Sequence, residues 1–208
     1  MNNLNQKENP LLYWCSKIGD FCVLSVLWLL MCIPVLTVIP ACIALFDSIA
    51  HCIHGTEDGT VRRFFRTFKN ELLRGILLSL IWLVVGCGLA YGYTILHQMG
   101  LENEVMSTYS KVYLVSMLIP MGILTWLIPV ESRFHHSFLG LFRAAIAYSI
   151  GHLPTTILLL VIFAVSVILV YFLPVLAVLM PAISVTVQCW FVEKIFKRYI
   201  PQKEEEND

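Results

Sequence analysis

Long apolar runs dominate the chain, and their lengths predict helices that cross a membrane. A transmembrane helix needs about 20 mainly apolar residues. Five stretches meet this requirement, at residues 21–50, 72–96, 112–130, 155–173 and 174–195. These runs stay almost continuously apolar and lack the strict alternation typical of membrane β-strands. The pattern therefore predicts an all-α, polytopic transmembrane bundle of about five spans in a single membrane domain.

The first stretch, residues 21–50, is too long for a simple span and contains two prolines. Thirty helical residues extend about 45 Å, whereas the hydrocarbon core is about 30 Å thick. Pro34 and Pro40 each remove a backbone donor and so kink or break a helix. One interpretation is a single kinked span, and the other is a re-entrant hairpin of two half-helices. We expect the kinked span, because neither half of this stretch is long enough to cross alone.

Two further segments have the mixed basic and aromatic pattern of helices that lie on a membrane surface, at residues 61–74 and 134–150. They predict two short interfacial helices, flanked at the chain ends by an N-terminal segment, 1–20, and a charged tail, 196–208. The first segment carries a cluster of cations that we expect to contact a partner protein or the inner leaflet. These residues are Arg62, Arg63, Arg66 and Lys69.

The charge distribution predicts an orientation. Lys and Arg gather in the cytoplasmic loops of membrane proteins. Eleven basic residues flank the predicted spans on one side and three on the other, which predicts an extracellular N-terminus and a cytoplasmic C-terminus in the cell membrane. A hairpin in place of the first span would put both termini inside. The formal net charge is zero, from 14 basic and 14 acidic residues, which argues against a nucleic-acid partner.

Few side chains in the spans carry chemistry. The candidate helix-break or cavity residues are Pro34, Thr37, Pro40 and Asp47. We expect the hydroxyls of Ser25, Thr37 and Thr125 to bond to their own helix backbone. Residues 51–54 supply two histidines and one cysteine, short of the four ligands of a structural zinc site. The sequence therefore predicts no catalytic residue, cofactor or metal, and the protein is not expected to be an enzyme.

The apolar stretch around the two prolines resembles the opening of the YesL family, bacterial membrane proteins catalogued as domain of unknown function 624. The resemblance rests on residues that this sequence shares with the family pattern: Trp28, Pro34, Val35, Thr37, Pro40, Ala41, Ala44 and Leu45. Residues 65–70, F-R-T-F-K-N, are similar to a second family element, and residues 142–154 to a third. Ser25 and Ile39 depart from the family pattern, which has asparagine and glycine there.

The resemblance implies a function but assigns no residue to it. Members are often encoded near carbohydrate transporters, which implies an accessory or scaffold role in carbohydrate uptake, with sugar ABC transporter subunits as partners. The alternative is a small-molecule transporter or substrate-binding component, because broken helices often line transport sites. The spacing of Gly88 and Gly92 permits close helix packing, within the bundle or in a homo-oligomer.

Overall fold

The computed structural model describes residues 10–54, 59–101, 104–133 and 137–199, and the regular structure of these residues is entirely helical. The elements in order are α2 (Pro10–Met31), η1 (Val35–Thr37), α3 (Val38–His54), α4 (Thr60–Gly100), α5 (Glu104–Ser116), α6 (Leu118–Arg133), α7 (Phe138–Gly151), α8 (Leu153–Phe172), η2 (Pro174–Val178) and α9 (Met180–Tyr199). The outer parts of the predicted segments 1–20 and 196–208, and the first residues of 134–150, lie outside the described residues.

The all-α membrane fold is confirmed, with four candidate spans in the described residues where about five are predicted. These segments are Val35–Cys52, Thr60–Gly100, Glu104–Arg133 and Leu153–Phe172, and Gly19–Met31 and Phe138–Gly151 are shorter apolar helices. The predicted fifth span, 174–195, begins instead as the 3-10 helix η2 and continues as α9. Helix α9 is less apolar because its last turns carry charged residues: Glu193, Lys194, Lys197 and Arg198.

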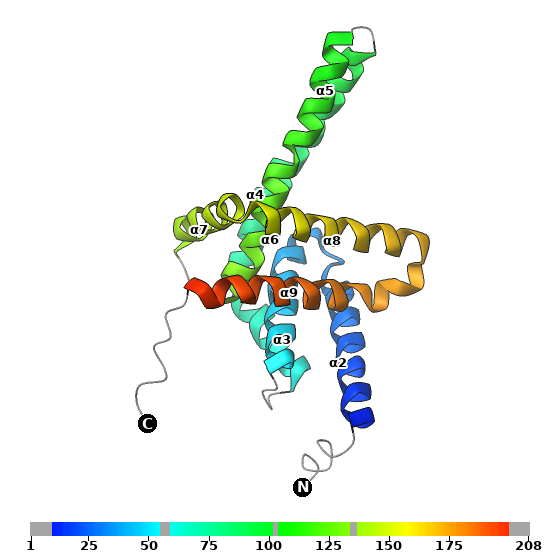
Figure 1. The fold of residues 1–208 in the computed structure, drawn as a ribbon, viewed down its shortest axis with the longest axis vertical. Helices are drawn as coiled ribbons and strands as arrows, with labels where there is room; N and C mark the ends of the chain where they lie inside the picture. Colours follow the sequence, from blue (N-terminus) through cyan, green and yellow to red (C-terminus); the bar gives the residue numbers. More distant parts are fainter. Residues whose placement is uncertain (1–9, 55–58, 102–103, 134–136, 200–208) are drawn as a thin grey trace.

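The helices form two groups that cross one another (Figure 1). Helices α2 and α3 stand side by side with the first part of α4, while α8 and α9 run across them. The remainder of α4 forms a hairpin with α5 that extends beyond the rest of the protein. Helix α3 lies at the centre, because it packs against α2, α4, α6 and α9.

The predicted single kinked span is wrong, and residues 21–50 belong to a helical hairpin. Helix α2 ends at Met31, the chain turns through η1, and α3 returns antiparallel to α2 (Figure 1). Pro34 cannot donate a hydrogen bond to the carbonyl of Leu30, so the helix cannot continue. The Thr37 hydroxyl lies 2.5 Å from the carbonyl oxygen of Met31 and 2.7 Å from that of Pro34, and its hydrogen is within reach of either acceptor at the end of α2.

The predicted interfacial segment 61–74 is also corrected, because it is the first part of the 41-residue helix α4. A helix of this length extends about 60 Å, twice the hydrocarbon thickness. Its aromatic face packs on protein instead of lipid: Phe64 is fully buried and its ring stacks on that of Phe68, with centroids 6.2 Å apart. Phe64 belongs to a core cluster with Leu24 and Ile49 of the hairpin.

The other predicted helices differ less from the helices of the structure. The predicted span 112–130 is covered by α5 and α6, which meet at Met117. Pro120 explains this break, since it has no N–H to donate to the carbonyl of Ser116. Helix α7 covers most of the predicted interfacial segment 134–150, and α8 covers the predicted span 155–173. A second core cluster, around the fully buried Trp126, joins α3, α4, α6, α7, α8 and α9.

Two helix N-termini are capped by hydroxyls from other helices. The Ser79 hydroxyl of α4 accepts a hydrogen bond from the N–H of Ile39 at 3.3 Å, at the start of α3. The Ser25 hydroxyl of α2 accepts from the N–H of Ala182 at 3.1 Å, at the start of α9. The expectation that Ser25 bonds to its own helix is therefore wrong. Thr125 does bond within its helix, to the carbonyl oxygen of Gly122.

The closest approach of α3 and α4 depends on a glycine, and this predicts a destabilising substitution. A Cβ atom at Gly75 would lie 2.6 Å from Cβ of Pro40, and nothing lies within 4 Å of a Cβ at Gly86 in the same helix. Gly75→Ala should therefore lower the free energy of unfolding by about 1–3 kcal/mol. The matched control Gly86→Ala should be neutral or stabilising by up to about 1 kcal/mol. Denaturant titration in mixed micelles measures both, and equal effects would contradict this packing.

Candidate functional site

The candidate site lies on the first part of α4, where the predicted cations are divided between two faces. Arg62, Arg66 and Lys69 are exposed, whereas Arg63 points toward α3 and only 18% of its side chain is exposed. Positions 62, 66 and 69 follow the i, i+4, i+7 spacing that aligns side chains along one side of a helix. We refer to these three residues as the cationic row. The half-exposed ring of Phe65 lies on the same part of the helix.

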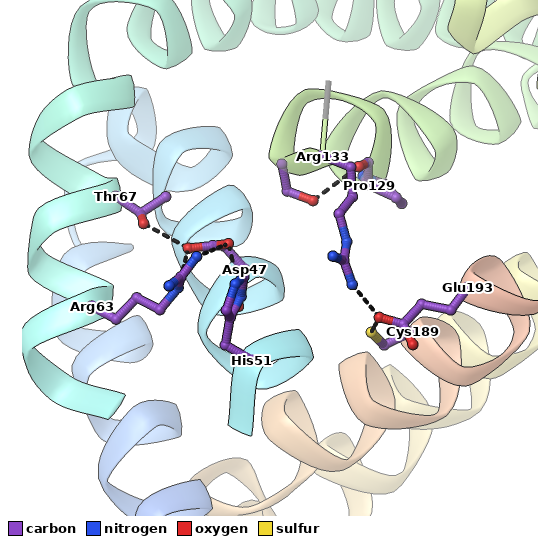
Figure 2. Close-up of polar contacts among 9 residues, drawn as sticks. Asp47, His51, Arg63, Thr67, Pro129, Arg133, Cys189 and Glu193 are labelled. Carbon is purple, nitrogen blue, oxygen red and sulfur yellow. Dashed lines mark hydrogen bonds and ion pairs between the residues drawn. The ribbon is translucent and has the colours of Figure 1, made fainter. Parts of the chain in front are cut away.

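Asp47 of α3 holds the inner face of this segment in place. Nε of Arg63 lies 2.9 Å from Oδ2 of Asp47 and Nη2 lies 3.1 Å from Oδ1, which makes a bidentate pair (Figure 2). The Thr67 hydroxyl donates to Oδ2 at 2.7 Å, and Nδ1 of His51 lies 3.3 Å from Oδ1. Asp47 itself is only 6% exposed. Bidentate, charge-assisted contacts of this kind are among the stronger polar interactions in proteins.

A second buried ion pair holds α4 at Arg74, about three turns after Arg63. Oε1 of Glu131 in α6 lies 2.8 Å from Nη1 of Arg74, and the Glu131 side chain is completely buried. The two pairs connect α4 to α3 and to α6 at points about three turns apart on one face, so the helix that presents the cationic row is held at two positions.

A third pair lies at the same end of α6, two residues after Glu131. Arg133 pairs with Glu193 of α9, and Sγ of Cys189 lies 3.7 Å from the same carboxylate oxygen (Figure 2). Burial raises the pKa of the Cys189 thiol to about 12, and the negative charge of Glu193 acts in the same direction. The thiol therefore stays protonated near neutral pH and is not a reactive thiolate.

A cavity of about 400 Å³ lies among α2, α3, α6, α8 and α9. The predicted helix-break or cavity residues do not line it. Pro34 is exposed in the turn, Thr37 stabilises that turn, Pro40 packs on Gly75, and Asp47 pairs with Arg63. The cavity therefore forms between the two crossing groups of helices and not at the prolines.

The sequence singled out the cationic segment and, as a helix-break or cavity residue, Asp47, but it did not indicate that Asp47 pairs with Arg63. Asp47 and Arg63 lie sixteen residues apart, and their contact depends on the antiparallel packing of α3 on α4. Arg74 and Glu131 lie near the ends of the predicted spans 72–96 and 112–130. The one sequence signal for their contact was the positive-inside pattern, which places these two span ends on the same side of the membrane. Among the side chains that the structure describes, no group of three His, Cys, Asp or Glu gathers, and the side chain of His54 lies outside them.

Comparison with known proteins gives one match. Residues 21–93 match the family model described as "Protein of unknown function, DUF624". No curated protein matches the chain, and no solved structure matches it. The matched residues run from α2 to α4 and include the turn, Asp47 and the cationic row.

The third block of the family resemblance, residues 142–154, lies outside the matched residues. The resemblance inferred from the sequence is thus confirmed for this region, and residues 21–93 are a DUF624 domain.

Proposed function

We propose that this multi-span membrane protein is an accessory or scaffold protein that docks a partner through the cationic row, and that it acts in carbohydrate uptake and not as an enzyme. The observation that carries the proposal is the exposed row Arg62, Arg66 and Lys69 on a helix anchored by two buried ion pairs. A rigid helix that presents aligned cations is suited to bind an acidic protein surface.

The pairing of the buried carboxylates supports a scaffold over an enzyme. Asp47 and Glu131 are both committed to arginines, and Glu193 pairs with Arg133. A general acid or base needs a carboxylate within reach of a substrate. The link to sugar ABC transporter subunits comes from the family resemblance, and it names the partner to test.

The alternative function, a small-molecule transporter or substrate-binding component, is favoured by the cavity. The broken helices, which also suggested a transporter, support this alternative less well. Half-helices that bind transported ions use free backbone groups at their ends, whereas one N–H in the first turn of α3 and one in the first turn of α9 already bond to Ser79 and Ser25. The cavity wall is mainly apolar and ill-suited to a sugar. We therefore retain the scaffold as the proposed function.

We also propose that the N-terminal end of α2 lies on the cytoplasmic side with the cationic row. The expected extracellular N-terminus depended on a single first span, and the hairpin removes that premise. The Thr60 hydroxyl at the start of α4 lies 3.4 Å from Oδ2 of Asp20, so these two positions share one end of the fold.

Cysteine labelling tests this topology in a cysteine-free background. Gly19→Cys and Gly59→Cys occupy open positions, and Leu101→Cys lies in the exposed turn between α4 and α5. A membrane-impermeant maleimide should label position 101 in intact cells and label positions 19 and 59 only after permeabilisation. Labelling of position 19 but not 59 in intact cells would support the single kinked span instead.

Affinity capture from native membranes tests the docking function. The variant Arg62→Glu, Arg66→Glu, Lys69→Glu reverses the cationic row and spares Arg63. The control Lys111→Glu, Arg143→Glu, Lys194→Glu makes the same net charge change at exposed positions elsewhere. We expect sugar-transporter subunits to co-purify with the wild type and with the control. The amount that co-purifies with the row variant should be at least tenfold lower. Labelling at position 59 verifies that the row variant keeps its topology. Equal recovery from all three proteins would contradict the proposal.

A further inference from the structure

The cavity between the crossing helices has a buried floor and an open rim. Its volume of about 400 Å³ lies in the range of small-molecule sites, about 300–1,000 Å³. Leu45 and Phe46 of α3 form part of the floor and are 1% and 2% exposed. Lining residues on α2, α6 and α8 are 37–53% exposed and form the rim: Leu29, Met121, Phe163 and Val167. The cavity is therefore a deep recess that opens at the side of the helices.

The wall offers apolar surface and little free hydrogen-bonding capacity. Three lining hydroxyls each donate to a carbonyl oxygen three or four residues earlier in their own helix, at 2.7–3.0 Å: Thr125, Ser166 and Ser184. The Gln188 carboxamide of α9 also lines the recess, and it makes no hydrogen bond with the described part of the chain. A ligand that fits this wall is an apolar chain with one acceptor for an amide N–H.

We propose that the recess binds an acyl chain of a membrane glycerolipid, with the Gln188 amide donating to the ester carbonyl. The rim residues Phe163 and Val167 lie on α8, a candidate span whose exposed side chains are largely apolar and which we therefore expect to contact lipid. The mouth of the recess is thus continuous with the lipid-facing surface, and a chain enters without crossing water. Filling an apolar recess with an acyl chain is favourable because the groups that line it gain contacts that a void lacks.

Photocrosslinking in nanodiscs tests this site, with phosphatidylglycerol that carries a diazirine on one acyl chain as the probe. Lipid in the surrounding bilayer reaches exposed side chains such as Ile168, which is 54% exposed, but not the floor. We expect adducts on Leu45 or Phe46 as well as on exposed positions. Adducts confined to exposed side chains would overturn the proposal without bearing on the cationic row.

Substitutions separate the recess from the bilayer. Ser166→Phe should fill the recess and reduce floor adducts at least tenfold while keeping those at Ile168. Val165→Phe, one residue earlier and 47% exposed, should leave both unchanged. Gln188→Leu removes one hydrogen bond and should reduce floor adducts about threefold to tenfold. Equal floor labelling in Ser166→Phe and wild type would overturn the proposal. If Ser166→Phe fails to fold, Ser166→Leu and the wild-type adducts still decide the question.

Discussion

Replacing Arg74 by leucine should lower the free energy of unfolding by about 3–5 kcal/mol, the largest effect that we expect from any single substitution. The substitution removes the cation of Arg74 from the carboxylate of Glu131, whose side chain is completely buried. Unpaired buried charges are costly because the protein interior cannot replace the solvation that water provides. Denaturant titration of the purified protein in mixed micelles measures the change.

Two controls isolate the ion pair from the general effect of losing an arginine. Arg66→Leu removes an exposed cation two turns earlier in the same helix and should change stability by at most about 0.5 kcal/mol. The double variant Arg74→Leu, Glu131→Leu removes both charges and should recover most of the lost stability. If the double variant is as unstable as the sum of the two single variants, the ion pair does not exist as described.

The second large effect is expected at Asp47. Asp47→Ala removes the partner of Arg63 and the acceptor for Thr67, and it should destabilise the protein by about 2–4 kcal/mol. Arg63 is left in a position where only 18% of its side chain is exposed. The same denaturant titration measures this loss.

A double-mutant cycle with Arg63→Leu decides whether the contact is responsible. We expect a coupling energy of about 1–3 kcal/mol between the two positions, because they form one bidentate pair. The reference pair Asp47→Ala with Lys69→Leu should show no coupling, since Lys69 is exposed. Additive effects of Asp47→Ala and Arg63→Leu would contradict the cluster shown in Figure 2.

The apolar runs predicted most of the helices, and their errors have physical causes. The position of the first break was predictable, because Pro34 and Pro40 cannot donate to the helix backbone. The hairpin that follows from this break was not predictable, because the first apolar stretch was measured from residue 21 and its two halves seemed too short to cross the membrane. Helix α2 in fact begins at Pro10 and extends 22 residues. Polar residues near Lys17 and Asp20 interrupt the apolar run there, and hydropathy alone therefore shortened the helix.

The candidate site shows what a pattern along one helix cannot determine. An amphipathic segment must bury its apolar face, but the sequence does not say whether lipid or protein covers it. Phe64 and Phe68 of α4 pack on the α2–α3 hairpin, so the predicted surface helix became part of the core. The same packing turned Arg63 inward and left the cationic row outside. Pairing of Arg74 with Glu131 required the tertiary fold, because these residues come from separate spans.

Site-specific crosslinking from the cationic row tests the proposed docking function most directly. A photoreactive phenylalanine analogue at Phe65, which is 43% exposed, should give an adduct with a sugar-transporter subunit in living cells. The same analogue at Val84, 64% exposed in the later part of α4, should give none. Reversing the charges of Arg62, Arg66 and Lys69 should abolish the adduct from position 65. No transporter adduct at position 65, or one that survives the charge reversal, would contradict docking through the cationic row.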